Sequence, residues 1–492
     1  MEFYTNVARY GNMLLYRGYK NGRKVQEKIK YKPTLFVNTP KPTPWKSLTG
    51  VPVAPVQMES MRDAKEWIAA NKQTAGRLIF GNDKHIHSFI NDEFPGIIEW
   101  DRAKINVTSF DIEVASDEGF PLPEDANYPV ISIALRNNID NIYYVWGLND
   151  YDVSAKLTDK EVIYKKCGSE AELLSDFIYH WSLPKNCPDI ITGWNVRFFD
   201  VPYLVNRTLK ILGEDMVKRF SPWGLVDRYD VKIMNRSQAT YDLKGRKLSY
   251  AEHGSLHTLY KFDHQKFIDY NIKDVEIVER LEDKMGLITL CLTMAYQGGV
   301  NYGDTFGVTS IWECIIYRYL HANKTVAPFY ENKIKSDYPG GYVKDPMVGM
   351  HKNVVSFDLN SLYPSLIMQY NMSTETIANG EVMNVDIEKL LNGYKFDNPG
   401  KGIGGNGQLF RTDKKGFMPT LVDGMYSERV EIKKEMIQAQ KDLQKVDKRS
   451  KQDVYAIERR INIAENRQMA IKILLNSLRK TMLLLLTRIH FM

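Results

Sequence analysis

The chain has 492 residues, of which 43% are hydrophobic and 26% are charged, and its formal net charge is +6. This length exceeds one hydrophobic core and predicts several domains, and the balanced composition is typical of a globular, soluble protein. No export signal opens the sequence, and the apolar run at residues 482–486 is far shorter than the ~20 residues that cross a bilayer, so we expect a cytoplasmic protein and no membrane partner.

The first hundred residues alternate short apolar runs with turn signals. Residues 30–37, 77–83 and 96–100 are predicted to be strands and residues 61–72 a helix, which indicates a small mixed α and β domain. From residue 105 the pattern changes to buried strands, followed by a helix over 171–184. The expected strands cover residues 106–116, 128–138 and 141–148. This order is typical of an α/β unit built on a mixed sheet.

A second strand, turn and helix unit is predicted over residues 354–370. The Gly-rich stretch 398–408 lacks the GK[ST] ending of a phosphate loop, so we interpret it as a surface loop. From residue 426 apolar residues recur every three or four positions, with a polar break at 447–453, which predicts an antiparallel helical hairpin. Residues 426–480 contain fourteen Lys and Arg against eight Asp and Glu, so the hairpin carries the basic surplus. That surplus indicates either solvated helices or a surface that meets phosphates.

Acidic residues in apolar contexts form the first candidate site. FDIEV places Asp111 and Glu113 two residues apart on a strand, so both side chains share one face. Asp200 lies in the apolar segment ITGWNVRFFDVPYL, and YNIKD places Tyr270 and Asp274 at i and i+4 of a helix. Any one acid alone is explained as well by a cap or a salt bridge. Together they indicate hard divalent cations that clamp the oxygens of a phosphodiester during hydrolysis, with the tyrosine positioning the water.

FDIEV, TGWNVRFFD and YNIKD resemble the three exonuclease motifs of family B DNA polymerases, and are most similar to those of T-even-like bacteriophages. The resemblance implies a ribonuclease-H-like 3′ to 5′ proofreading domain with Mg²⁺, two ions per site, and Mn²⁺ as the alternative ion. It implies four metal ligands, Asp111, Glu113, Asp200 and Asp274. It also implies that Tyr270 orients the nucleophilic water and that Asn195 and Phe199 grip the primer end. The span from Asp200 to Asp274 is shorter than the family pattern, with RKLSYAEHG directly after YDLKG.

A second candidate site follows from VVSFDLNSLYPSLI, where an apolar strand ends in Asp358 and a turn opens a helix. Asp358 and the Leu359 carbonyl are suited to hold magnesium with a triphosphate, and Tyr363 to pack under the sugar and exclude a 2′-hydroxyl. DLNSLYPS resembles polymerase motif A of the same family.

The same resemblance implies that the helical hairpin is the fingers. Arg429 and Lys433 are i, i+4 neighbours on its first helix, and Lys472 and Asn476 share a face of its second. The resemblance implies that Arg429 and Lys472 bind the incoming dNTP, with Lys472 as a general acid for the pyrophosphate leaving group.

The expected fold is therefore an α/β multidomain protein with a mixed α+β N-terminal domain, an exonuclease domain, a partial palm and helical-hairpin fingers. The expected limits are residues 1–105 with 300–333 returning, 106–299, 334–415 and 416–492. No DTD motif follows Asp358, and the match to the family's motif B ends at Leu478, where Arg479 and Lys480 replace its tyrosine and glycine. We therefore expect the amino-terminal portion of a truncated or split polymerase, without the second palm half and the thumb.

The expected partners are primer-template DNA, dNTPs and a second polymerase half, with a sliding clamp as a further candidate, in the host cytoplasm if the source is a phage. A chain with one palm carboxylate is not expected to extend a primer alone. Two alternatives stay open: a stand-alone exonuclease and a non-catalytic nucleic-acid-binding fragment, whose affinity would fall steeply with salt.

Overall fold

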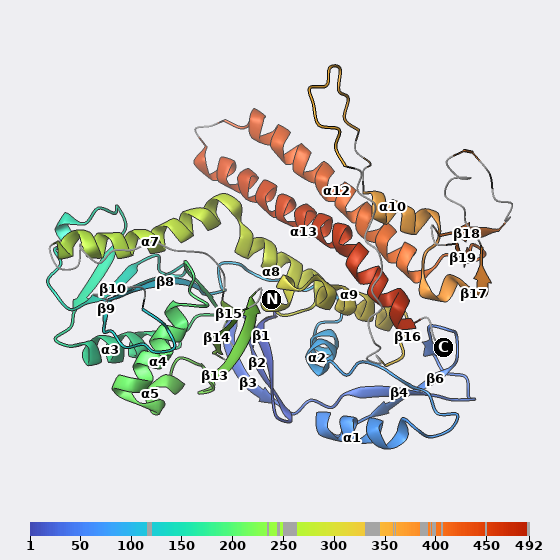
Figure 1. Cartoon of the computed structure of the whole chain (residues 1–492), viewed down its shortest axis with the longest axis horizontal. Coiled ribbons are helices and arrows are strands. Elements are labelled where there is room, and N and C mark those ends of the chain that lie inside the picture. The colour runs from blue at the N-terminus through green and yellow to red at the C-terminus, as the bar shows by residue number, and fades with distance from the viewer. Residues whose placement is uncertain are drawn as a thin grey trace. The chain divides into compact units, whose positions relative to one another are not determined.

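The computed structural model describes most of the chain (Figure 1). The described residues are 1–115, 121–233, 236–243, 247–248, 263–329, 345–357, 359, 361–383, 392–393, 395, 400–404, 407–447 and 450–489. The chain divides into two compact units, the first comprising Met1–Tyr31 and Phe89–Phe306 and the second Lys32–Ser88 and Gly307–Met492. This division is coarser than the four expected domains, whose limits stay predictions. Among the described residues, none of the helices combines the length and the apolar character that crossing a bilayer requires.

A six-stranded mixed sheet is the centre of the first unit, as the sequence predicted. β8 pairs antiparallel with β9 and β9 with β10, whereas β10–β11, β8–β12 and β12–β15 are parallel pairs. In spatial order the strands are β11 (Val162–Lys166), β10 (Tyr143–Gly147), β9 (Val130–Asn137), β8 (Val107–Val114), β12 (Ile190–Thr192) and β15 (Lys247–Leu248).

Helices cover both faces of this sheet (Figure 1). On one face α7 (His264–Met285) packs Phe267 and Ile272 against β9 and β10. On the other, α3 (Glu170–Ser182) and α4 (Asp200–Leu212) pack against Phe110 and Ile112 of β8. Because successive strand residues point to opposite faces, Asp111 and Glu113 point toward α7.

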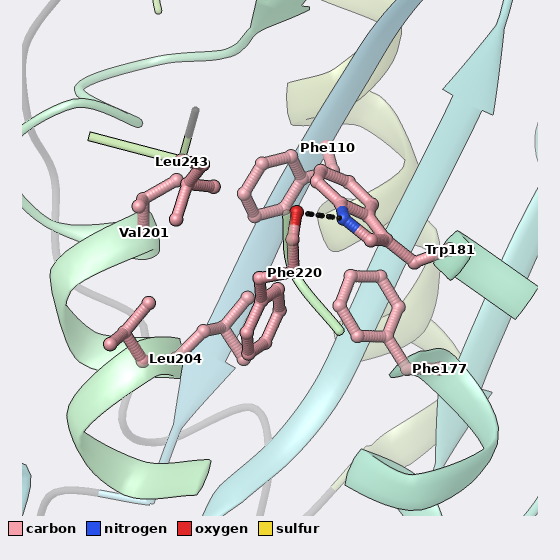
Figure 2. A pocket seen from close by; sticks show the side chains of 8 residues that line it. Phe110, Phe177, Trp181, Val201, Leu204, Phe220 and Leu243 are labelled. Carbon is pink, nitrogen blue, oxygen red and sulfur yellow. Dashed lines mark hydrogen bonds between the residues drawn. The ribbon is translucent and has the colours of Figure 1, made fainter. Parts of the chain in front are cut away.

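A small void lies in the core between α3, α4 and the sheet (Figure 2). Its volume is about 10 Å³, roughly one water molecule. Aromatic and aliphatic side chains line it, and Trp181 Nε1 beside it donates to the Phe220 carbonyl at 3.2 Å. Such a void is a packing feature and not a nucleotide site.

An antiparallel sheet of β1 (Phe3–Tyr10), β2 (Met13–Lys20) and β3 (Arg23–Ile29) joins the same unit. A buried ion pair attaches it, because Arg17 Nη2 lies 3.1 Å from Asp189 Oδ1. The Asn301 side chain adds two bonds of 2.9 Å to the backbone of Val7. The predicted strand at 96–100 is wrong: these residues form no strand, and Ile97 is 96% exposed, with none of the described strands pairing with this segment.

The second unit begins with β4 (Thr34–Asn38), β6 (Val53–Gln57) and β7 (Ile79–Phe80), and helix α1 (Met61–Asn71) packs on this sheet. Ser60 caps α1 by accepting from the Asp63 amide. The predicted strands in 30–37 and 77–83 and the helix at 61–72 are confirmed, with shorter strands. Later in the chain β16 (Thr325–Val326) pairs in parallel with β5 (Lys46–Ser47).

The predicted helical hairpin is confirmed as α12 (Phe417–Lys445) and α13 (Lys451–Ile489), which lie side by side in Figure 1. Two ion pairs, Glu428 with Arg467 and Asp442 with Arg460, give the antiparallel register. Both helices are longer than predicted. Helix α9 (Val308–Ala322) packs on α13, where the buried Trp312 donates its indole N–H to the Leu474 carbonyl at 3.1 Å.

Two predictions between these segments are wrong. Residues 354–357 form no strand, and Phe357 is 91% exposed, because a strand needs hydrogen-bonding neighbours and none of the described residues pairs with this segment. The Gly-rich stretch is not only a loop, since β18 (Lys401–Ile403) pairs with β19 (Gln408–Arg411), which also pairs with β17 (Ile377–Val382). The predicted helix after Asp358 is present as α10 (Leu362–Gln369).

Candidate functional site

Three acids from two elements meet on the α7 face of the sheet. One carboxylate oxygen from each of Asp111, Glu113 and Asp274 lies within 4.8 Å of the other two, and all three side chains are half-buried. Strand alternation brings the two β8 acids to this face, and α7 supplies Asp274 across it. The donor set contains only carboxylate oxygens, which is the set that hard divalent cations such as Mg²⁺ or Mn²⁺ prefer. The residues present therefore fit such an ion.

Asp200, the fourth predicted acid, is buried at the first residue of α4 and is attached to the backbone of β8. Its Oδ1 accepts a hydrogen bond of 3.1 Å from the Ile112 amide. That amide is accessible because β12 is short and pairs with β8 only as far as Ser109. Asp200 is therefore bound to the strand residue that stands between Asp111 and Glu113. Its charge is among the causes that raise the pKa of both of these acids.

Two backbone features carry the chain from β12 to Asp200. A Cβ on Gly193 would lie 2.5 Å from the Phe110 carbonyl oxygen, so only glycine permits this approach to β8. Asn195 follows in the left-handed region at φ 56°, which asparagine tolerates better than most residues, and its carbonyl accepts from the Phe199 amide at 3.0 Å. Phe199 itself is half-buried against the core of the first unit.

Burial and like charge dominate the electrostatics of this cluster. Burial, then Asp200 and the other acids, raises the pKa of Asp111 well above its usual range. Burial with Asp274 and Asp200 raises the pKa of Glu113 to about 8, and burial raises the pKa of Asp200 to about 7. Burial also raises the pKa of Asp274. Acids that suppress one another's ionisation in this way are stabilised when a cation sits among them.

Tyr270 lies one helical turn before Asp274, as predicted, and their side chains are hydrogen bonded. Burial and the neighbouring carboxylates raise the pKa of Tyr270, so its phenol keeps its proton. A protonated phenol is a donor at the edge of the acid cluster. Its predicted task of orienting a water stays a prediction.

The residues of the second candidate site are spread over α10, α12 and α13. Asp358 lies outside the described residues. Leu359 is 70% exposed and Tyr363 of α10 is 41% exposed. Helix α10 packs against both hairpin helices.

The four predicted hairpin residues lie on α12 and α13. Arg429 is half-buried, whereas the other three are exposed: Lys433, Lys472 and Asn476. Glu428 of α12 and Arg467 of α13 form an ion pair across the hairpin. Arg429 follows Glu428, and Lys472 follows Arg467 by five residues, so Arg429 and Lys472 lie on facing helices within about two turns of this pair.

Sequence reasoning missed two neutral residues, of which Asn271 contacts the acid cluster and Ser132 contacts Asn271. Asn271 donates its amide N–H to Asp111 Oδ2 at 2.7 Å, and Ser132 donates its hydroxyl to Asn271 Oδ1 at 2.9 Å. A signal for Asn271 was present, because it stands inside YNIKD between Tyr270 and Asp274. Ser132 had no local signal, since it reaches the site through the pairing of β9 with β8.

Comparisons with known proteins agree on one family. Residues 81–248 match the family model described as DNA polymerase family B, exonuclease domain, and residues 307–479 match the model described as DNA polymerase family B. The DNA-directed DNA polymerase of Escherichia phage RB69 is 31% identical over 500 residues, covering 90% of this chain and 55% of the relative. That of Enterobacteria phage T4 is 28% identical, with 91% and 55% covered. DNA polymerase 1 of Sulfurisphaera ohwakuensis is 29% identical over 65% of this chain and 41% of its own length. The chain thus spans about half the length of the phage relatives.

Proposed function

The chain belongs to DNA polymerase family B, as its exonuclease and motif A segments predicted, and on this premise we propose that it serves template-dependent DNA synthesis with 3′ to 5′ proofreading. The proofreading part of this proposal rests on the acid cluster, in which carboxylate oxygens of Asp111, Glu113 and Asp274 lie within 4.8 Å of one another. Asp200 is hydrogen bonded to β8, the strand that carries Asp111 and Glu113. The proposed reaction is metal-dependent hydrolysis of the terminal phosphodiester of a DNA 3′ end.

In this proposal Asp111, Glu113 and Asp274, with Asp200 beside them, would hold Mg²⁺ or Mn²⁺. When bound, the ion lowers the pKa of a water and offsets charge that develops on the phosphate. Tyr270 offers its phenolic proton to orient that water. Asn195 and Phe199, on the turn that leads into Asp200, would hold the primer end. The support for these two roles is their place in the turn and their match to the family motif.

The test is trimming of a 5′-labelled single-stranded DNA by the purified chain. We expect Mg²⁺-dependent shortening from the 3′ end that is lost in Asp111→Ala. Ser109→Ala is a matched control, because Ser109 is buried two residues away on β8 and its hydroxyl has no partner among the described residues. Equal trimming by the wild type and Asp111→Ala would refute the proposal.

For the polymerase half we propose that a dNTP with Mg²⁺ binds residues of α10, the hairpin and the turn before them. These residues are Asp358, Leu359, Tyr363, Arg429, Lys433, Lys472 and Asn476. Motif A and the basic, exposed faces of α12 and α13 support this proposal. Two-metal catalysis needs a second carboxylate beside Asp358, and the 492 residues contain no DTD motif after it.

We therefore propose that primer extension requires a second polymerase half with the rest of the palm and the thumb, as in a split or truncated enzyme. We also propose that the chain works with a sliding clamp and that it acts in the host cytoplasm. Magnesium-dependent extension of a primer by the purified chain alone would contradict it. A stand-alone exonuclease predicts full trimming without any partner, whereas a non-catalytic fragment predicts salt-sensitive DNA binding without turnover.

A further inference from the structure

Two neutral side chains form a series of hydrogen bonds that ends on the Asp111 carboxylate. Asn271 and Ser132 are both completely buried. The Asn271 amide donates to Asp111 Oδ2 at 2.7 Å, and the Ser132 hydroxyl donates to Asn271 Oδ1 at 2.9 Å. We refer to Ser132 and Asn271 as the relay. Buried polar groups of this kind are costly unless they are paired, so the relay is a specific arrangement of three elements.

The relay reaches every strand and helix that supplies the three-acid cluster. Ser132 lies on β9, directly opposite Glu113 in the pairing of β9 with β8. Asn271 lies on α7, next to Tyr270 and three residues before Asp274. The relay therefore connects β9 to α7 and α7 to β8 at the level of the acids.

The donor and acceptor chemistry allows only one orientation of this relay around an ionised Asp111. A carboxylate is only an acceptor, so the NH₂ end of Asn271 must face it. The carbonyl end then needs a donor, and the Ser132 hydroxyl, which can rotate, supplies one. The bond engages Oδ2 of Asp111 and leaves the remaining acceptor positions of the carboxylate for a cation.

We propose that Ser132 and Asn271 are positioning residues that fix one oxygen of Asp111 and thereby aim the other at the bound divalent cation. This inference rests on the proposed exonuclease function. Partners of this kind, which orient a ligand without touching the metal, typically change metal affinity about 10–100-fold when removed.

The experiment is Mn²⁺ binding to the full chain without DNA, measured by the electron paramagnetic resonance signal of free Mn²⁺. The site in question is the binding component that Asp111→Ala removes. Asn271→Leu keeps the side-chain volume and should weaken that component about 10–100-fold. Ser132→Ala should weaken it about two- to tenfold, because it removes one neutral hydrogen bond.

The double variant separates a relay from two independent structural effects. Because Ser132 acts on Asp111 only through Asn271, Ser132→Ala combined with Asn271→Leu should bind Mn²⁺ like Asn271→Leu alone. Ser109→Ala is the control, since it removes a buried hydroxyl on the same face of β8 and should leave the affinity unchanged.

The outcomes distinguish the inference from the function on which it rests. Wild-type affinity in both Asn271→Leu and Ser132→Ala, with the component lost in Asp111→Ala, overturns the positioning role and leaves the proposed function intact. Losses that add in the double variant overturn the relay. No component that depends on Asp111 in the wild type overturns both. If Asn271→Leu does not fold, as circular dichroism would show, Ser132→Ala decides alone, and unchanged binding in it overturns the inference.

Discussion

Replacing Asp111 with asparagine should stabilise the metal-free protein at alkaline pH, because it removes one charge from a crowded cluster and keeps the shape of the side chain. Oxygens of Asp111, Glu113 and Asp274 lie within 4.8 Å of one another. At that separation and an effective dielectric constant of about 20, the repulsion of one ionised pair is about 3.5 kcal/mol. Partial exposure and proton uptake by the cluster reduce it, so for Asp111→Asn we expect a gain of about 2 kcal/mol in the free energy of unfolding of the first unit.

The sign of the pH dependence follows from the raised pKa values. In the folded protein the pKa of Glu113 is about 8 and that of Asp200 about 7, above the 4.5 and 3.8 of the free groups. Between these limits the folded state binds more protons than the unfolded state. The contribution of the cluster to stability is therefore complete below about pH 4 and is lost as the pH rises through 7 and 8. Asp111→Asn should accordingly stabilise the protein less at pH 5 than at pH 9.

The assay is thermal unfolding in a metal chelator at pH 5 and pH 9, followed by circular dichroism. A gain of about 2 kcal/mol corresponds to a rise of roughly 4–8 °C in Tm for a domain of this size. Saturating Mg²⁺ at pH 9 should reverse the order, because the wild type binds the ion and the variant lacks a ligand. Asp189→Asn is the contrasting control: its carboxylate pairs with Arg17, so the variant should be destabilised at both pH values. A destabilised Asp111→Asn at pH 9, or an equal change at both pH values, would refute the reasoning.

Two further predictions concern how the first unit is held together. Arg17→Met removes one of the two cations that lie 3.1 Å from the buried Asp189, the other being Lys24, and should cost about 2 kcal/mol in urea unfolding; an unchanged midpoint in this variant would contradict this. Gly193→Ala places a Cβ 2.5 Å from the Phe110 carbonyl oxygen and should lower both Mn²⁺ affinity and Tm. Gly96→Ala, whose added Cβ would lie more than 4 Å from the other described side chains and backbone, should change neither; matching behaviour of the two variants would count against the close approach.

The sequence was sufficient where the pattern is local. A period of two put Asp111 and Glu113 on one face of a strand, and a period of 3.6 put Tyr270 one turn from Asp274; the structure confirms both arrangements. These periods depend only on the backbone of one element. The helical hairpin was predictable for the same reason, because each of its helices is long and strongly periodic.

The sequence was insufficient where the arrangement depends on pairing between distant segments. Asp200 reaches β8 through the Ile112 amide, and that amide is accessible only because β12 stops at Thr192. The expected strand before Asp358 is the opposite case, in which the local sequence favours a strand but the structure forms none at residues 354–357. Its residues have the composition of a strand, but in the described residues 354–357 no neighbour pairs with them, and composition cannot supply one.

Charged and neutral members of one site also differ in how visible they are. An acid in an apolar strand is conspicuous, because an unpaired buried charge demands an explanation. A buried serine or asparagine demands only one hydrogen bond, which many positions in a fold can supply. Ser132 and Asn271 become informative only once the register of β9 against β8 places Ser132 opposite Glu113 and the rotation of α7 places Asn271 at Asp111. The residues that aim a metal ligand are therefore set by tertiary register, and variants of Ser132 test that register as directly as variants of the acids test the charge.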